Sequence, residues 1–185
     1  NTLQMFVEQN QHLDEVPLYK LPVQIEVYAG GKRIRDTYWV ENVKDTFELN
    51  VGKKPDLVNF DAQKVILCNK IDEKEVEEWV YMLNNAPLYM DKKEALDQLG
   101  MSGNPKAKIA IKNALDHPFW NVRKMALQKS YNLIKSDKNG MKPVIKEMAN
   151  DDHPAVRKAA LNTLSQRWQG DSDLMSVYER ALEDS

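Results

Sequence analysis

The sequence is poor in the residues that build disulfides and metal sites, and it has no large excess of charge of either sign. Its 185 residues include 1 cysteine and 3 histidines. A single cysteine excludes an internal disulfide framework and a cysteine-rich zinc site. The 26 Lys and Arg residues nearly balance the 28 Asp and Glu residues. This balance provides no overall positive charge for holding a nucleic acid backbone, and we expect no nucleic acid partner.

Long apolar runs and a leader segment are also missing. No stretch approaches the ~18 consecutive apolar residues of a membrane-spanning helix, and we expect no membrane partner. The sequence has no initiator Met and opens directly in the alternating segment 2–8, which is typical of a strand. We therefore expect a fragment of a longer protein, part of whose function resides elsewhere.

The composition changes near residue 71. Residues 1–71 hold 16 Val, Ile or Thr residues and 2 Ala, whereas residues 72–185 hold 11 of the β-branched residues and 11 Ala. β-branched residues favour strands, and alanine favours helices. The sequence therefore predicts a β domain over 1–71 and a helical domain over 72–185, with the boundary between residues 69 and 74.

Alternating apolar and polar residues predict about six short strands in the β domain. Gly30 and Gly31 separate two alternating runs, which is typical of a tight hairpin. Other strands are predicted at residues 2–9, 46–51, 57–60 and 64–68. A small antiparallel β-sandwich buries one face of each sheet and is the predicted fold. Cys68 ends the last apolar run, so a buried, unreactive thiol is expected there.

The helical domain contains a repeated string. Asp-His-Pro, followed by Val-Arg-Lys and then Ala-Leu, occurs first from Asp116 and again from Asp152, with a period of 34 residues at the Val-Arg pair. Asp caps a helix N-terminus, and Pro is tolerated in the first turn. A period in the thirties made of helix pairs predicts a solenoid. The string resembles the second helix of a HEAT repeat.

The repeat gives its charged residues a structural role. Arg123 is expected to pair with Asp116, and Arg157 with Asp151 or Asp152. The alternative role for the two arginines is binding of an anionic ligand or a peptide carboxylate.

The histidines and tryptophans of the helical domain also have structural interpretations. His117 and His153 occupy equivalent places before a proline, where we expect helix starts. A metal site is the alternative, but no third ligand repeats beside them. Packing in the core or between repeats is expected for Trp79, Trp120 and Trp168.

The order of the two domains resembles a known family. A small β-sandwich that leads directly into HEAT-like helices looks like the C-terminal region of zinc aminopeptidases of the aminopeptidase N type. Residues 3–9 and 19–25 resemble strands of that family's third domain, in which a strand ending in Gln is followed by a loop and a strand opening with Leu-Pro. Segments 45–49 and 57–61 fit later strands of the same domain. Over 72–185 the resemblance rests on the helical repeat.

The resemblance implies a non-catalytic portion of such an enzyme. The family's His-Glu-x-x-His helix and Gly-x-Met-Glu-Asn segment do not occur here, so no catalytic or metal-binding residue carries over. We expect the chain alone to be inactive and to hold no cofactor. The parent would use zinc to hydrolyse N-terminal peptide bonds. The sandwich would then be a spacer, and the helices would wall the substrate chamber.

The partners implied by this resemblance are an upstream catalytic domain in the same polypeptide and the parent's peptide substrates. A second hypothesis is a HEAT-type protein-interaction scaffold that is related to these aminopeptidases but lacks catalysis. A third is a separate hydrolase with an unrecognised site, although no G-x-S-x-G elbow marks a nucleophile.

Function in a solenoid is expected on the second helices of the pairs, which usually form the inner face. Basic side chains there would suit the carboxylate end of a peptide. The predicted chamber-lining residues are Tyr89, Lys92, Lys93, Phe119, Lys124, Lys129 and Lys158.

Overall fold

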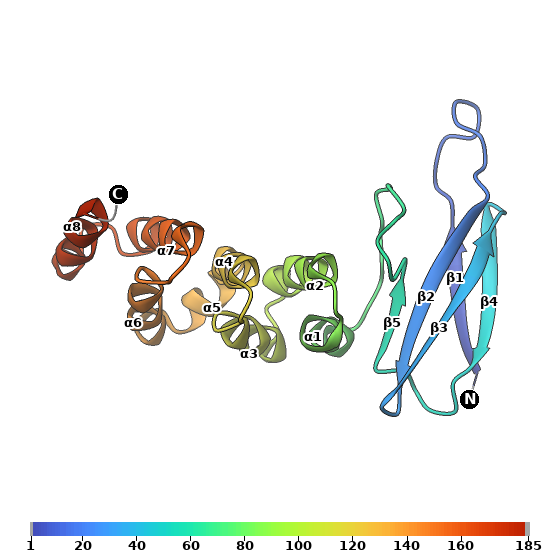
Figure 1. Cartoon of the computed structure of the whole chain (residues 1–185), viewed down its shortest axis with the longest axis horizontal. Helices are drawn as coiled ribbons and strands as arrows, with labels where there is room; N and C mark the ends of the chain where they lie inside the picture. Colours follow the sequence, from blue (N-terminus) through green and yellow to red (C-terminus); the bar gives the residue numbers. More distant parts are fainter. Residues whose placement is uncertain (1, 184–185) are drawn as a thin grey trace. The chain divides into compact units, whose positions relative to one another are not determined.

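The chain forms two compact units, Asn1–Met82 and Leu83–Ser185. Their structure is a computed structural model that describes residues 2–183. The described strands lie in the first unit, and most of the helices lie in the second (Figure 1). The predicted order of a strand-rich part followed by a helical part is confirmed.

The first unit contains two antiparallel sheets. Its strands are β1 (Thr2–Glu8), β2 (Leu21–Ala29), β3 (Lys32–Val40), β4 (Lys44–Asn50) and β5 (Leu57–Phe60). β1 pairs with β4 in one sheet, and β2 lies between β3 and β5 in the other. The predicted hairpin is confirmed, because Gly30 and Gly31 adopt φ values of 57° and 74° between the paired residues Ala29 and Lys32. Positive φ at both positions is what a two-residue hairpin turn requires.

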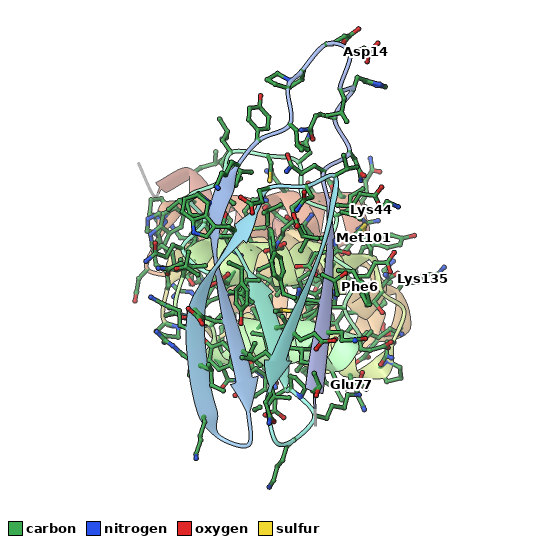
Figure 2. All side chains as sticks on the ribbon, turned by 90° about the vertical axis from the view of Figure 1, so that its right-hand side faces the viewer. Phe6, Asp14, Lys44, Glu77, Met101 and Lys135 are labelled. Carbon is green, nitrogen blue, oxygen red and sulfur yellow. The ribbon has the colours of Figure 1, made fainter. Side chains whose placement is uncertain are left out.

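One apolar cluster contains residues from both sheets. Met5 of β1 is buried in it together with Ile25 and Val27 of β2, and Phe47 of β4 packs against it. These residues point to one side because side chains alternate along a strand. Phe6, the residue after Met5, is exposed on the other side of β1 (Figure 2).

A buried carboxylate lies on the opposite face of the three-stranded sheet. Glu26 of β2 is 1% exposed and accepts a hydrogen bond of 2.8 Å from the Tyr28 hydroxyl. Arg35 donates from Nε at 2.6 Å, and Arg33 lies 3.1 Å from the same carboxylate. Both arginines come from β3, which pairs with β2. The carboxylate is therefore fully compensated, as a buried charge requires.

The predicted strand at 64–68 is wrong. Asp61 and Lys64 adopt positive φ values of 51° and 55°, and the chain turns after β5 instead of continuing into a ladder. The Asp61 carboxylate accepts the backbone N–H groups of Val65 and Ile66, each at 3.1 Å. These donors are satisfied locally, so they are not available to a neighbouring strand.

The expected burial of Cys68 is also wrong, because the thiol is exposed. Val65 and Leu67 of the same run are exposed as well. Ile66, which lies between them in the sequence, is partly buried against the apolar cluster. A short apolar run alone therefore does not determine burial.

The helices begin after an irregular connection that follows β5. The helices are α1 (Val76–Asn85), α2 (Tyr89–Met101), α3 (Pro105–Ala114), α4 (Trp120–Gln128), α5 (Tyr131–Ser136), α6 (Lys138–Met148), α7 (Pro154–Arg167) and α8 (Met175–Glu183), with a short 3₁₀ turn at Ser172–Leu174. Residues 69–74, the predicted boundary, form no helix or strand. The compact units divide between Met82 and Leu83. The predicted domain division between residues 71 and 72 stays a prediction.

Within the second unit, the second helices of the repeats share one layer. α2, α4 and α7 lie in one row, and α3 and α6 lie in the other (Figure 1). α4 contacts both α2 and α7, whereas α6 packs against α7. The row of α2, α4 and α7 therefore places equivalent side chains of successive repeats next to one another.

Candidate functional site

Both repeat histidines lie at helix starts, as predicted. His153 is the N-cap of α7, and its Nδ1 accepts a hydrogen bond of 3.2 Å from the backbone N–H of Ala155. His117 lies two residues before the N-cap of α4, Phe119, and its Nδ1 accepts the backbone N–H of that residue at 3.0 Å. Each imidazole accepts a hydrogen bond from a backbone N–H at a helix start, as a capping side chain does.

Arg157 contacts the two aspartates predicted for it, but through their backbone. Arg157 donates from Nη1 to the carbonyl oxygens of Asp151 at 2.9 Å and Asp152 at 3.2 Å. The two residues are those predicted, but the acceptors are backbone carbonyls. Arg123 makes the equivalent contacts from Nη1 to the carbonyls of His117 and Pro118 at 2.9 and 3.0 Å.

The predicted carboxylate partner of Arg123 is wrong. Arg123 forms a bidentate ion pair with Asp151, from Nε and Nη2 at 2.7 Å each, and not with Asp116. Asp151 lies in the turn before α7, and α7 packs on α4, so the pair joins two successive repeats. Hydrogen bonds from the guanidinium are the main cause that lowers the pKa of Asp151 and raises that of Arg123.

Aromatic rings connect the starts of the three second helices. The rings of Tyr89 on α2 and Phe119 at the N-cap of α4 meet edge to face, with centroids 5.5 Å apart. Phe119 contacts Trp120 at 5.8 Å, and Trp120 stacks on His153 at 3.7 Å with an interplanar angle of 3°. We call Tyr89, Phe119, Trp120 and His153 the second-helix row. Packing between repeats is thereby confirmed for Trp120.

The other two tryptophans also have the expected packing. Trp79 and Trp168 are 5% and 6% exposed. Each lies under a lysine, with Lys74 over Trp79 at 5.0 Å and Lys138 over Trp168 at 5.8 Å. These two rings are core residues and are not part of the row.

Three of the predicted lysines contact side chains of α2 or α4. Lys124 Nζ lies 5.1 Å from the centroid of the Trp120 ring. Lys93 and Lys129 both bind Asp97, at 2.8 and 2.6 Å. Burial of Asp97 raises its pKa, but the hydrogen bonds from the two lysines outweigh this effect, and its pKa lies below the ordinary value.

The remaining two lysines of the prediction have different surroundings. Lys92 donates from Nζ to the carbonyl oxygen of Leu83 at 2.7 Å, and burial lowers its pKa. The Lys92 ammonium group therefore satisfies a backbone carbonyl of the helical unit. Lys158 is exposed on α7, at the rim of a hollow.

Sequence reasoning missed the residues that hold the end of α2 against α4 and α5. A Cβ at Gly100 would lie 2.8 Å from Cβ of Lys129, so only glycine permits the observed approach. Asn132 donates from Nδ2 to the carbonyls of Gly100 at 3.1 Å and Ser102 at 3.3 Å, at the end of α2. Asp97, which binds Lys129 in the same region, could have been found from the sequence. It lies four residues after Lys93 and can pair with it on one helix face.

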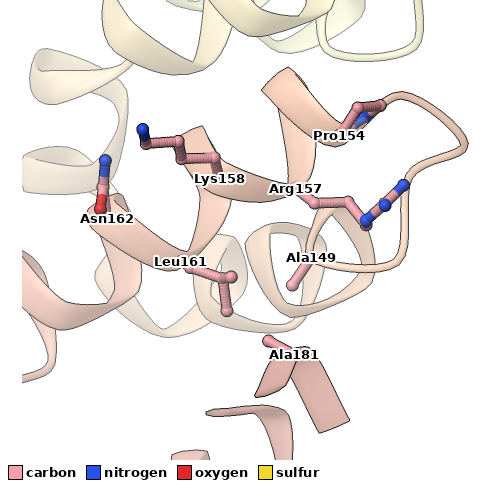
Figure 3. A pocket seen from close by; sticks show the side chains of 7 residues that line it. All are labelled: Ala149, Pro154, Arg157, Lys158, Leu161, Asn162 and Ala181. Carbon is pink, nitrogen blue, oxygen red and sulfur yellow. The ribbon is translucent and has the colours of Figure 1, made fainter. Parts of the chain in front are cut away.

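A hollow of about 220 Å³ lies between α6, α7 and α8 (Figure 3). Its side chains are apolar in the middle and polar at the edge. The lining residues are Ala149, Pro154, Arg157, Lys158, Leu161, Asn162 and Ala181. In Figure 3, Leu161, Ala149 and Ala181 lie around the centre, while Lys158 and Arg157 extend to opposite sides.

The described part of the chain offers no evident centre for metal chemistry. Among residues 2–183 no group of three or more His, Cys, Asp or Glu side chains could hold a metal ion. None of the helices in that range is both long and apolar enough to cross a lipid bilayer.

The titration of His117 gives a testable pH dependence. Burial is the main cause that lowers the pKa of His117 below its ordinary value of 6.5, with Lys92 and Arg123 adding to the effect. As the pH falls, the histidine therefore binds a proton in the unfolded chain at a higher pH than in the folded chain. The free energy of unfolding is expected to decrease as the pH falls below about 6.5. It stops decreasing below the folded-state pKa. Urea unfolding from pH 7.5 to 5 measures this loss.

The variant that tests this prediction is His117→Asn. The introduced asparagine keeps an acceptor near the start of α4 but does not titrate, so His117→Asn is expected to flatten the profile. A profile that His117→Asn does not alter would assign the pH dependence to other groups.

Comparison with known proteins identifies one element of the chain. A family model for the HEAT repeat matches residues 141–166, which include most of α6 and α7. This helix pair carries the second copy of the repeated string. No curated protein matches the sequence.

Proposed function

We propose that this chain is a non-catalytic interaction module whose helical unit binds peptides along the second-helix row. The observation that carries the proposal is the unbroken aromatic contact from α2 through α4 to α7. Phe119, in the middle of the row, is 41% exposed, although it contacts two other rings. An exposed aromatic residue held rigid by its neighbours is a favourable anchor for a partner side chain.

The lysines on and beside α2 and α4 define the chemistry of the expected peptide. Lys124 lies over Trp120, and Lys93 and Lys129 share the single carboxylate of Asp97, which leaves an excess of positive charge. A segment with both acidic and apolar side chains is complementary to this surface. Neighbouring helices are about 10 Å apart, so roughly six extended residues reach from α2 to α7.

The proposal includes a finer description of both units. The two sheets are interpreted as a β-sandwich, which is supported by the apolar cluster that draws on both of them. The helices are interpreted as a HEAT-like solenoid, which is supported by the family match, the repeated string and the layer of second helices. HEAT arrays commonly bind partners on such a surface.

A second candidate is the C-terminal part of a zinc aminopeptidase of the aminopeptidase N type. The observation that favours it is the order of units, a strand-rich unit followed directly by HEAT-like helices, together with the strand strings at 3–9 and 19–25. The strand-rich unit would be a spacer, and the second-helix row would line the chamber for the peptide substrate. Its partner would be the catalytic domain of the same polypeptide.

In this candidate, zinc would be bound by the catalytic domain and not by the residues of the present chain. The chain has no His-Glu-x-x-His string, and His117 and His153 use Nδ1 to accept backbone hydrogen bonds. No step of catalysis is therefore assigned to these residues. A His-Glu-x-x-His string in the coding sequence upstream of residue 1 is expected for this candidate, whereas its loss there would favour the scaffold.

Binding of a labelled peptide tests the proposed surface. The probe is a fluorescein-labelled peptide of about eight residues composed of Glu, Leu and Phe, and its anisotropy is measured with the full chain. We expect saturable binding that weakens with added salt. Phe119→Ser keeps a favourable N-cap for α4 but removes the ring, and it is expected to weaken binding about tenfold.

Charge reversal supplies the matched control. Lys124→Glu on α4 is expected to weaken binding by a similar factor, whereas Lys112→Glu on α3 is expected to have little effect. Both changes alter the net charge equally, so only the place of the charge differs. Equal loss in the two variants, or no loss in either, would refute binding at the row.

A further inference from the structure

An ordered loop at residues 9–20 projects from the strand-rich unit between β1 and β2 (Figure 1). Gln9 closes the base of this loop, because its side chain accepts the backbone N–H of Tyr19 at 3.1 Å and donates to the Tyr19 carbonyl at 2.8 Å. A turn near the far end is closed by the backbone N–H of Val16, which donates to the carbonyl of His12 at 2.8 Å. The loop is therefore held in shape by its own hydrogen bonds.

The far end of the loop exposes apolar and acidic side chains together. We call residues 12–19 the loop tip. Leu13 is 48% exposed, and Asp14 and Glu15 beside it are exposed as well (Figure 2). Leu18, on the return towards β2, is 39% exposed. The loop tip contains these two carboxylates and no Lys or Arg, so it is an acidic and apolar segment.

The helical unit carries a surface of complementary chemistry. Phe119 in the middle of the second-helix row is 41% exposed, and Lys124 lies over the neighbouring ring of Trp120. Residues 101–168 contain 13 Lys and Arg against 5 Asp and Glu, whereas residues 1–100 contain 12 against 18. Positive and negative charge are therefore separated along the chain, although the whole chain is nearly neutral.

We propose that the loop tip of one copy of this chain binds the second-helix row of a second copy. This inference rests on the proposed peptide binding by the row and names the partner. Leu13 packs on Phe119, and the two carboxylates beside Leu13 lie towards Lys124. Charge complementarity selects this occupant, and an ordered loop loses less conformational entropy on binding than a flexible one. The contact joins two different surfaces, so it is heterologous.

Sedimentation velocity of the full chain at increasing concentration tests the proposal. We expect self-association that weakens with added salt. Leu13→Ser removes the apolar side chain of the loop tip, and Lys124→Glu reverses a charge at the row. Neither side chain lies in the buried core, and each change is expected to weaken self-association at least about tenfold. A wild-type chain that stays monomeric at millimolar concentration would overturn the proposal.

Mixing the two variants tests whether the contact is heterologous. Leu13→Ser keeps an intact row, and Lys124→Glu keeps an intact loop tip. An equimolar mixture is therefore expected to form a one-to-one complex that neither variant forms alone. A mixture that stays monomeric at concentrations where the wild-type chain associates would overturn binding of the loop tip to the row.

Phe6→Ser and Lys112→Glu are the matched controls. Phe6 is 77% exposed on β1, outside the loop, and Lys112 is exposed on α3, outside the row. Both changes are expected to leave self-association unchanged. Self-association that Leu13→Ser and Lys124→Glu weaken no more than these controls do would assign the contact to other surfaces and overturn the proposal.

The labelled peptide of Glu, Leu and Phe separates failure of this inference from failure of the proposed function. We expect the peptide to bind the row and to dissociate the assemblies. Peptide binding by a chain that does not self-associate would overturn the second copy and leave peptide binding intact. Absence of both would overturn both. A monomeric chain whose peptide affinity rises with Leu13→Ser would assign the loop tip to the row of its own chain and overturn the second copy.

Discussion

Arg123→Met is expected to lower the free energy of unfolding of the helical unit by about 2–4 kcal/mol. The change removes two hydrogen bonds to the Asp151 carboxylate and two to backbone carbonyls. The side chain of Asp151 is only 11% exposed, so its charge would remain poorly solvated and without this partner. Urea unfolding followed by circular dichroism at the helix band measures the loss.

A double-mutant cycle separates the ion pair from the backbone contacts. Asp151→Asn is expected to cost less than Arg123→Met, because Arg123 keeps its bonds to the carbonyls of His117 and Pro118. The two changes together should cost less than the sum of the single changes, since they share one interaction. Additive losses, or a loss below about 0.5 kcal/mol for Arg123→Met, would show that the pair does not stabilise the repeat contact.

Trp120→Ala is the second change with a large expected effect, about 2–4 kcal/mol in the free energy of unfolding. The indole contacts Phe119, stacks on His153 and lies under Lys124, so its removal opens the contact between α4 and α7. The loss should fall below that of a fully buried tryptophan, because Trp120 is only partly buried. The same urea unfolding measurement applies.

Trp39→Ala is the matched control for Trp120→Ala. Trp39 lies on β3, is 51% exposed and has Lys20 over its ring, so this change removes an aromatic residue with a cation contact from the other unit. We expect a loss below about 1 kcal/mol. An equal loss in both variants would contradict a special role for the Trp120 stack.

Most of the local structure could be predicted from the sequence, because its causes are local. Alternation and paired glycines predicted the hairpin at Gly30 and Gly31, and the repeated string predicted the starts of α4 and α7. The strand predicted at 64–68 does not form, and the reason is also local, although the composition does not reveal it. The Asp61 side chain captures the two backbone donors that a strand would have used.

The candidate site was less predictable, because it depends on which repeats lie next to each other. The repeat showed that Arg123 and Arg157 are equivalent, but it did not show that Arg123 reaches forward to Asp151 of the next repeat. The prediction of chamber-lining lysines treated the lysines of the second helices alike. In the structure Lys92 binds a backbone carbonyl, whereas Lys124 lies over the row.

Amide hydrogen exchange of the full chain, with and without the acidic and apolar probe peptide, tests the central claim most directly. Binding along the second-helix row predicts slower exchange in the first turns of α2, α4 and α7, with α3 and α6 unchanged. Phe119→Ser should remove this protection. Protection confined to α3, α6 or the strands, or no protection at a saturating peptide concentration, would contradict peptide binding by the row.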